Sequence, residues 1–398
     1  MITVNEAKRI VESNTGLLHP VTIPLIDAAG CVLAADVLSG INSPSFDQAA
    51  MDGYAFAMDT VDIKKELPVS GMIPAGATHQ VLVQPGTAVK IFTGAPVPDG
   101  ADTIIMQEYV HETEMGIKID DEKIRKRSNI RYKASQIAVG EIAAKAGTRL
   151  SPGVMGYLSS LGVTEVTIYT APKIGIIITG KELVFPGTAL EFGQVYECNS
   201  MTITSALFEG RMEPSFLEYA DDDEEQVADA ISNGLEACDI LLITGGISVG
   251  KYDFVQSALK KCNVETLFYK VKQKPGKPLY FGKNENKLVF GLPGNPSAVL
   301  TCFYEYVVPC IRKMSGLKPA FYQNFTLPLN EDTYKKPGLT CFLKGKLMDN
   351  LVAVLSGQES YKLNAFTEAD CFVVLDESET DYKKGEQVVV HKINDCWI

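Results

Sequence analysis

Glycines and lysines that could hold an anion gather between residues 239 and 297 of this 398-residue chain. The segment 239–250, Asp-Ile-Leu-Leu-Ile-Thr-Gly-Gly-Ile-Ser-Val-Gly, is an apolar run that ends in glycines, the pattern of a buried strand that opens into a loop. Gly245, Gly246 and Gly250 have no Cβ atom, so the backbone there can turn sharply and approach a ligand closely. Backbone N–H groups at such a turn, with lysines nearby, suit an anion such as phosphate.

Four lysines, Lys270, Lys272, Lys274 and Lys277, form a basic cluster in an acidic protein. Such a run of charges usually marks a solvated surface. The Lys-Pro-Gly-Lys-Pro spacing of 274–278 at a strand end nevertheless favours a phosphate or oxyanion site, because each lysine offers a mobile point charge. Residues four apart in an extended segment share a face, so Lys270 and Lys274 are predicted to point the same way.

Three carboxylates accompany these groups. Glu182 follows the first strand of an α/β region, and ligands of open α/β sheets bind at the carboxyl edge. It could join Asp253 around a metal or oxyanion, although a single loop glutamate is more often only solvated. Asp253 suits equally an N-cap and a carboxylate beside a metal–phosphate group. Asp222 forms a capping-box-like pair with Glu225, so a structural role is the preferred interpretation there.

The motif Gly-Leu-Pro-Gly-Asn-Pro at 291–296 predicts a helix that starts at the same edge. Asn295 is a good N-cap, and proline is favoured at the first helical position, which Pro296 would occupy. Apolar residues recur behind it at helical spacing. The free N–H groups of this helix would therefore face the glycine loop.

The elements that must position these residues alternate between strand and helix from about Pro172, as in a parallel sheet with crossover helices. Strands are predicted at 173–179, 215–219, 239–244, 265–271 and 288–290, and helices at 200–209, 223–237, 254–261 and 296–314. The stretch from Pro44 to about Lys145 reads as a small all-β domain, with short β-branched runs between turns. Beyond Gly316 the chain is again rich in strands and turns, which suggests a compact β-barrel.

Two turns of the first β-rich stretch carry polar groups. Met-Asp-Gly-Tyr at 51–54 includes Asp52, and Thr-Gly-Ala-Pro-Val-Pro at 93–98 begins with Thr93, whose hydroxyl could serve a ligand. From the residues alone, both could equally be ordinary turns.

The bulk composition narrows the class of protein. The length predicts two to four domains, and 46% hydrophobic residues with a mean hydropathy of +0.05 indicate a soluble globular protein. A formal charge of −12 argues against general binding to nucleic acid or to anionic membranes. We find no membrane-length apolar run and no signal-peptide pattern. Nine cysteines without a Cys-x-x-Cys pair fit a reducing cytoplasm, the expected location.

The motifs, taken in order, resemble the molybdopterin molybdenumtransferase family, which includes bacterial MoeA and the C-terminal domain of gephyrin. The similar segments are Ala-Met-Asp-Gly-Tyr-Ala (50–55), Phe-Thr-Gly-Ala-Pro-Val-Pro-Asp-Gly-Ala-Asp (92–102), Met-Gln-Glu (106–108), Thr-Gly-Lys-Glu-Leu (179–183), Gly-Gly-Ile-Ser-Val-Gly (245–250), Lys-Pro-Gly-Lys-Pro (274–278) and Gly-Leu-Pro-Gly-Asn-Pro (291–296). Each motif alone is weak, whereas the ordered set spans essentially the whole chain and is specific.

The resemblance implies a multidomain fold of α/β and β parts. It implies a discontinuous N-terminal domain (1–43 and 146–171), an inserted β-rich domain (44–145), a parallel-sheet α/β molybdopterin-binding domain (172–318) and a C-terminal β-barrel (319–398). Members of the family are similar in forming elongated homodimers, with the site between the α/β domain of one subunit and the β domain of the other.

The implied reaction inserts molybdate into adenylylated molybdopterin and releases AMP and molybdenum cofactor, with Mg²⁺ as the metal. Catalytic positions implied by the resemblance are Glu182, Asp222, Asp253, Lys270 and Lys274, of which Glu182 and Asp253 would hold the metal. Substrate-binding positions are Asp52, Thr93, Gly245, Gly246, Ser248, Gly250, Lys277, Pro293, Gly294 and Asn295. The resemblance raises Asp222 above its helix-cap interpretation, with a register uncertain by one among three aspartates.

Other functions remain open at this point. One is a non-catalytic molybdopterin-binding scaffold, and another is a molybdopterin adenylyltransferase, which resembles the α/β domain alone. We expect no nucleic-acid or membrane partner, and we expect the adenylyltransferase and apo-molybdoenzymes as protein partners. The chain departs from the family pattern near 338–342, where Leu339 and Thr340 stand in place of an expected arginine.

Overall fold

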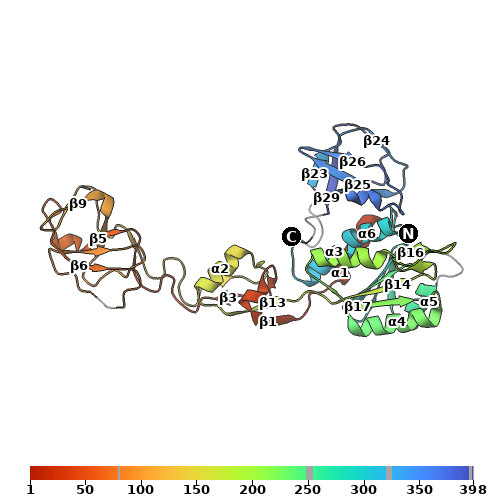
Figure 1. Cartoon of the computed structure of the whole chain (residues 1–398), viewed down its shortest axis with the longest axis horizontal. Helices are drawn as coiled ribbons and strands as arrows, with labels where there is room; N and C mark the ends of the chain where they lie inside the picture. The colour runs from red at the N-terminus through yellow and green to blue at the C-terminus, as the bar shows by residue number, and fades with distance from the viewer. Residues whose placement is uncertain (79–80, 248–253, 320–324, 394–396, 398) are drawn as a thin grey trace. The chain divides into compact units, whose positions relative to one another are not determined.

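The computed structural model describes residues 1–78, 81–247, 254–319, 325–393 and 397 (Figure 1). The chain divides into two compact units, one formed by residues 1–21 and 168–398 and the other by residues 22–167. The division into two units does not test the four finer domain boundaries, which stay a prediction.

A six-stranded sheet forms the centre of the larger unit, in the order β17-β14-β18-β22-β21-β19. Its strands are β14 (Ile174–Thr179), β17 (Pro214–Ala220), β18 (Ile240–Thr244), β19 (Glu265–Tyr269), β21 (Tyr280–Asn284) and β22 (Lys287–Leu292). The first four strands in this order are parallel, as expected. β21 is antiparallel to both of its neighbours, so the sheet is mixed and not wholly parallel. The sequence analysis did not predict β21.

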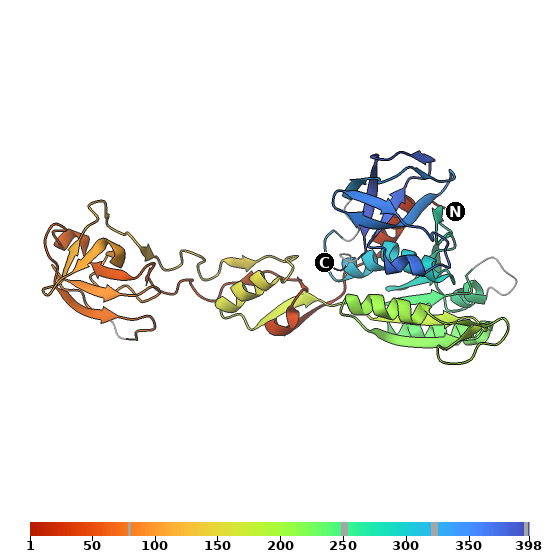
Figure 2. The ribbon, with the colours of Figure 1, turned by 45° about the horizontal axis from the view of Figure 1, so that its top comes forward.

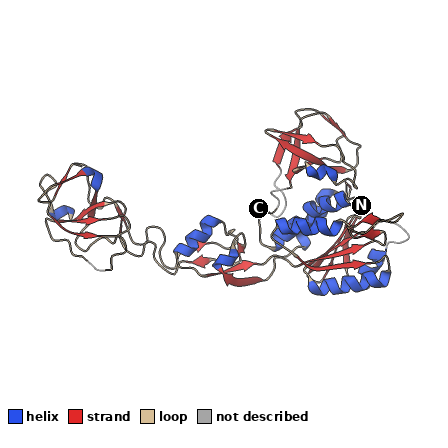
Figure 3. Ribbon diagram, viewed as in Figure 1, coloured by secondary structure: helices blue, strands red, loops and turns tan. Residues whose placement is uncertain are grey.

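Helices cover both faces of this sheet (Figures 1 and 3). The helical elements are α1 (Val4–Asn14), α3 (Asn199–Glu209), α4 (Glu224–Ala237), α5 (Phe254–Lys261), α6 (Pro296–Cys302), the π-helix η4 (Phe303–Val307) and α7 (Val308–Met314). Alternate residues of β14 pack on opposite faces: Ile176 and Ile178 join the core with α1, α3, α6 and α7, whereas Ile177 joins the core with α4 and α5. The apolar strands are therefore buried on both sides, as their continuous hydrophobic runs predicted.

The C-terminal part of the larger unit is a second six-stranded sheet, built along the order β20-β25-β27-β29-β23 with β26 paired to β25 (Figure 2). Its strands are β20 (Gln273–Lys274), β23 (Phe325–Pro328), β25 (Thr340–Met348), β26 (Leu351–Val354), β27 (Cys371–Leu375) and β29 (Gln387–Lys392). Beside it lie the pair β24 (Thr333–Tyr334) and β28 (Asp381–Tyr382) and the turn η5 (Asn364–Thr367).

The expected C-terminal β-barrel is not confirmed. Within the described residues, the pairing of the strands does not close the sheet. Closure would need a paired strand at a place where the structure has a single bridge, between Leu329 and Val352. The short apolar strands instead bury their hydrophobic side chains in a compact core that includes Val373 and Val390.

The smaller unit is rich in short strands (Figure 3). A four-stranded sheet has the order β6-β7-β5-β8. Its strands are β5 (Gly53–Phe56), β6 (Val69–Ile73), β7 (Ala88–Ile91) and β8 (Thr103–Met106). The remaining elements are β2 (Val32–Leu33), β3 (Val37–Leu38), β4 (Gln48–Ala49), β9 (Val110–Glu112), β10 (Ile117–Ile119), β11 (Ile130–Arg131), β12 (Ile142–Ala144), α2 (Pro152–Ser160) and the short turns η1 (Leu25–Ala28), η2 (Met58–Thr60) and η3 (Gln107–Tyr109). β1 (Pro20–Pro24), β13 (Glu165–Tyr169) and β2 form a three-stranded sheet in the order β1-β13-β2.

A buried ion cluster ties α1 and the C-terminal sheet to the helices of the larger unit. The Glu305 side chain in η4 is fully buried, and its two oxygens lie 2.6 Å from Lys8 Nζ and 2.8 Å from His391 Nδ1. Burial by itself would raise the pKa of Glu305, but attraction to His391 and Lys8 lowers it to about 2. The carboxylate is therefore held ionised inside the protein.

Among the described residues, no helix is both long and apolar enough to span a bilayer.

Candidate functional site

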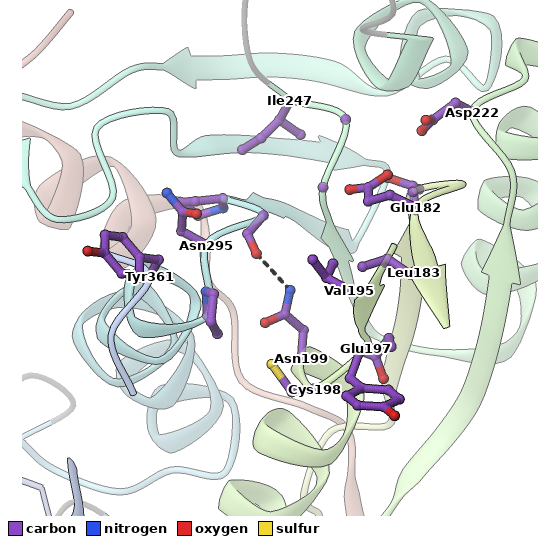
Figure 4. A pocket seen from close by; sticks show the side chains of 18 of the residues that line it. Glu182, Leu183, Val195, Glu197, Cys198, Asn199, Asp222, Ile247, Asn295 and Tyr361 are labelled. Carbon is purple, nitrogen blue, oxygen red and sulfur yellow. Dashed lines mark hydrogen bonds between the residues drawn. The ribbon is translucent and has the colours of Figure 1, made fainter. Parts of the chain in front are cut away.

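A cavity of about 710 Å³ opens at the carboxyl edge of the central sheet (Figure 4). Segments that follow four parallel strands line it: Gly180 and Glu182 after β14, Asp222 after β17, Gly245 after β18, and Gly294 after β22. Parallel strands deliver their carboxyl ends to one edge, which explains why loops far apart in sequence meet there.

The glycine loop after β18 crosses the end of β14 at close range. A Cβ atom at Gly245 would lie 2.4 Å from the carbonyl oxygen of Thr179, and one at Gly246 would lie 2.7 Å from Val255. Both glycines also have positive φ angles. Only glycine satisfies both conditions without strain, so the sharp turn inferred from the sequence is present at these two positions, and their approach to a ligand stays a prediction. Ser248 and Gly250 lie outside the described residues.

Two of the three predicted carboxylates line the cavity. Glu182 and Asp222 lie together at one side of it (Figure 4). Asp222 Oδ2 accepts a hydrogen bond of 3.5 Å from the backbone N–H of Lys181. The predicted capping pair of Asp222 with Glu225 is wrong, because the N-cap of α4 is Asp223, which accepts from the N–H groups of Glu225 and Gln226. Asp222 is thus left facing the cavity.

Asp253, the third carboxylate, lies outside the described residues. Within the described part of the chain, no group of three or more His, Cys, Asp or Glu side chains could hold a metal ion by itself. Mg²⁺ is nevertheless commonly bound by one or two carboxylates together with substrate phosphates. The oxygen donors of Glu182 and Asp222 fit an ion of that kind.

The Gly-Asn-Pro turn forms the opposite wall, with Pro293, Gly294 and Asn295 lining the cavity. Asn295 occupies the N-cap position of α6, but its side chain makes no capping hydrogen bond, contrary to the prediction. Its Nδ2 instead donates to Ser360 Oγ at 2.9 Å, and the N–H of Ser297 donates to the Ser360 carbonyl. Ser360, in a loop of the C-terminal sheet, therefore bonds to the start of α6 in place of the capping hydrogen bond that the Asn295 side chain does not make.

The C-terminal sheet contributes to the site in two further ways. The Lys344 ammonium is buried and donates to Ser297 Oγ at 3.0 Å and to the carbonyl oxygen of Lys362 at 3.2 Å. Burial lowers the pKa of Lys344. These contacts hold the loop whose Tyr361 ring lines the cavity (Figure 4). The C-terminal sheet thus contributes to the site through Lys344 and Tyr361.

The lysine cluster lies beside the cavity and not in its wall. Pro278 lines the cavity, whereas Lys274 and Lys277 are exposed. Lys274 belongs to β20, which pairs with β25 of the C-terminal sheet. The argument that Lys270 and Lys274 share a face fails, because Lys270 has a φ of +65° and the segment between them is not one extended strand.

Asp52 and Thr93 belong to the smaller unit, where the structure brings them together. The N–H and the hydroxyl of Thr93 each donate to Asp52 Oδ1 at 2.7 Å. The hydroxyl bond and then the backbone bond lower the pKa of Asp52. The two turns therefore form one ionised, hydrogen-bonded pair, a relation that the sequence analysis did not predict.

Sequence reasoning missed the residues at the start of α3 and the aromatic residue from the C-terminal loop. Cys198 and Asn199 line the cavity, as does Tyr361. Glu197 accepts from the Ser200 N–H at 2.8 Å and from its hydroxyl, so it caps α3. The available signal was a helix start at the carboxyl edge, where exposed N–H groups gather.

Models of known families cover most of the chain. The MoeA N-terminal region (domain I and II) matches residues 2–162, a probable molybdopterin binding domain matches 175–313, and the MoeA C-terminal region (domain IV) matches 326–393. A molybdopterin molybdenumtransferase of Haemophilus influenzae is 34% identical, over 99% of both chains. The chain belongs to the molybdopterin molybdenumtransferase family. The enzyme class predicted from the ordered motifs is confirmed.

Other members of the molybdopterin molybdenumtransferase family show the same extent of likeness. Molybdopterin molybdenumtransferase 2 of Mycobacterium tuberculosis is 30% identical, over 98% of this chain and 99% of its own. A molybdopterin biosynthesis MoeA protein of Pyrococcus horikoshii, solved by crystallography, superposes with a TM-score of 0.85 at 29% identity, over 99% of each chain. The chain therefore shares the multidomain MoeA fold along its whole length.

Proposed function

We propose that this protein acts in molybdenum cofactor biosynthesis by inserting molybdate into adenylylated molybdopterin, with release of AMP. The observation that carries the proposal is one cavity at which several of the family motifs meet. Glu182, Gly245 and Gly294, from three separate motifs, line the same cavity within the part that matches a molybdopterin binding domain.

The charges around the cavity suit this reaction. Molybdate and the phosphates of the adenylylated substrate are anions, and the exposed residues Lys274 and Lys277 precede Pro278, which lines the cavity. Each ammonium group offers a mobile positive charge that reduces the repulsion between the two anions as they approach each other. In the proposed reaction water cleaves the phosphoanhydride bond to AMP, and one oxygen of molybdate leaves as water with the two thiol protons.

Mg²⁺ is the metal that we propose, held by Glu182 and Asp253, with Asp222 nearby. Two oxygen donors at the cavity fit an ion that also contacts substrate phosphates. A bound Mg²⁺ would supply charge neutralisation at the adenylyl phosphate. The carboxylates orient that charge, and the backbone of the glycine loop holds the phosphate end of the ligand.

We further propose that the functional form is a homodimer. Large apolar side chains lie exposed on the larger unit, and Phe185 and Tyr219 pack edge to face with ring centroids 4.7 Å apart. The Tyr219 hydroxyl lies 3.2 Å from Ser200 Oγ, next to the exposed Met201, and the Phe192 ring is fully exposed. A second copy that covers this apolar surface would remove it from water.

In the proposed dimer, the site is completed in trans. All residues that line the cavity belong to the larger unit, whereas Asp52 and Thr93 belong to the smaller one. We propose that the Asp52–Thr93 pair of one subunit serves the cavity of the other, as the family resemblance implies. We also propose a cytoplasmic location, since the eight described cysteines are all free thiols, and the adenylyltransferase and apo-molybdoenzymes as partners.

The test is a reconstitution with purified protein, adenylylated molybdopterin and Mg²⁺, with or without molybdate. We expect AMP to appear only when molybdate is present, together with a product that activates an apo-molybdoenzyme. A scaffold would bind the substrate and release no AMP, and an adenylyltransferase would form the adenylylated substrate from ATP. Either result would overturn the proposed reaction.

A further inference from the structure

The Asn199 carboxamide is fixed in one orientation at the base of the cavity. Asn199 is the first residue of α3 and is 6% exposed. Its Nδ2 donates to the carbonyl oxygen of Gly294 at 3.0 Å (Figure 4). A carbonyl oxygen only accepts hydrogen bonds, so the nitrogen of the carboxamide must face Gly294 and Oδ1 must point the other way.

Asn199 Oδ1 is a buried acceptor without a hydrogen-bond partner among the described residues, and less than 1 Å² of it is exposed. A buried polar atom without a partner is costly, and native proteins retain few of them. The neighbouring Glu197 carboxylate already accepts from Ser200 through both of its oxygens, whereas Asn199 Oδ1 has no partner in the described part of the chain. Asn199 Oδ1 thus has its full bonding capacity left for a ligand.

The surroundings of Asn199 suit a flat ring. Val195 lies beside Asn199 with Leu183 beyond it, and Ile247 and the Tyr361 ring line other sides of the cavity (Figure 4). The Asp222 carboxylate lies at the far side of the cavity from Asn199 in the same view. A ligand with a phosphate and a heterocycle can therefore place the phosphate near the glycine loop and the ring near Asn199.

We propose that Asn199 Oδ1 accepts a hydrogen bond from the exocyclic 2-amino group of the pterin ring, and so selects an amino-bearing ring. The inference rests on the proposed function, which supplies a pterin as ligand. Because Oδ1 is recessed, the donor that reaches it must project from the ring. The exocyclic amine projects in this way, whereas the ring N3–H is flanked by the C4 carbonyl, whose oxygen would approach Oδ1 unfavourably.

The test compares two probes by isothermal titration calorimetry: 6-hydroxymethylpterin and the same compound without the 2-amino group. We expect the wild-type protein to bind the amino-bearing probe roughly tenfold more tightly, because the other probe leaves the acceptor unpaired. Asn199→Leu should bring the two affinities to within about twofold of each other. Equal affinities in the wild type, or a tenfold preference that survives in Asn199→Leu, would overturn the proposal.

Two further variants separate recognition from support of the loop. Asn199→Asp keeps an acceptor and loses the donor to Gly294, so it should retain the preference even where overall affinity falls. Asn284→Leu is the matched control, because the Asn284 Nδ2 also donates to a backbone carbonyl, that of Cys262 at 3.0 Å, outside the cavity lining. It should leave the preference unchanged. A purely structural role of Asn199 would remove the preference in the Asp and Leu variants alike, and that result contradicts recognition.

Failure of this inference differs from failure of the proposed function. If molybdate-dependent AMP release occurs but Asn199→Leu keeps the probe preference, only the role of Asn199 is wrong. If the probe preference behaves as expected but no AMP is released, the reaction is wrong and the ring-binding role stands.

Discussion

Glu182 and Asp222 bring two carboxylates to a cavity whose proposed ligands are themselves anions. Cations must therefore compensate the charge, and the lysines of residues 270–277 precede Pro278, which lines the cavity. The Gln273 side chain holds the turn between these lysines, because its Nε2 donates to the carbonyl oxygens of Pro275 and Gly276 at 3.2 Å each.

Replacing lysines with methionine should separate members of this cluster. Lys270→Met and Lys274→Met should each raise the molybdate concentration for half-maximal AMP release by about tenfold, since each removes one charge-assisted contact. Lys272→Met should have a smaller effect, because Lys272 Nζ lies 3.9 Å from Glu377 and is already compensated. Steady-state kinetics at varied molybdate measures this. An equal or larger effect for Lys272 would show that the assigned roles are wrong.

Residue types could be assigned to the site from the sequence, but orientations could not. The motifs placed Glu182, Gly245 and Gly294 at the cavity, where the structure has them. The capping role was assigned to Asp222 instead of Asp223, because neighbouring aspartates are equivalent until the helix start is known. Asn199 could not be singled out, since its importance depends on a contact with a loop distant in sequence.

At the scale of elements, the strands and helices around the site followed from local patterns. The continuous run of residues 239–244 matches β18, and α5 has the predicted bounds. β21 was missed because its five residues follow a Pro-Gly turn and carry no helical or alternating pattern of their own. Closure of the C-terminal sheet into a barrel is not confirmed, and the sequence could not decide it, since closure depends on pairing between strands distant in sequence.

The ion cluster of Glu305 should contribute strongly to the stability of the larger unit. Glu305→Gln removes the charge that balances Lys8 and His391, and breaking a buried ion pair typically costs roughly 3–5 kcal/mol. We expect a loss of that size in the free energy of unfolding at pH 7, measured by urea denaturation. Glu209→Gln, an exposed change on α3, is the control and should be near neutral. A loss below about 1 kcal/mol for Glu305→Gln would contradict the role assigned to the cluster.

The same residue predicts a pH dependence. The folded-state pKa of Glu305 is lowered from 4.5 to about 2, so its contribution is complete above the unfolded value and is lost as the pH falls from about 4.5 towards 2. The wild type should therefore lose stability over that range more steeply than Glu305→Gln. Urea midpoints at pH 5, 4 and 3 check this, and parallel curves for the two proteins would rule it out.

At the scale of the whole molecule, the two compact units carry different parts of the proposed site. The cavity belongs to the larger unit, and the Asp52–Thr93 pair belongs to the smaller one. The family membership was predictable because the motifs occur in order along the entire chain. The completion of the site by a second subunit is a proposal that needs a test on mixed subunits.

Mixed subunits test completion in trans. Asp52→Ala and Lys274→Ala proteins should each have little activity at a molybdate concentration well below that needed by Lys274→Ala, since each lacks one part of every site. After subunit exchange, a mixed dimer holds one intact site, so activity should return to about half per mixed dimer. Exchange is verified with two affinity tags. Exchange without recovered activity would count against a shared site.

The most direct test of the central claim measures AMP release in single turnovers by wild type, Glu182→Gln and the control Glu191→Gln. Glu182 lines the cavity, whereas Glu191 is exposed in the same connecting segment and does not line it. If the cavity is the site of molybdate insertion, Glu182→Gln should lower the molybdate-dependent rate by about 10²-fold or more, and Glu191→Gln should behave as wild type. A wild-type rate for Glu182→Gln would place the reaction elsewhere and contradict the claim.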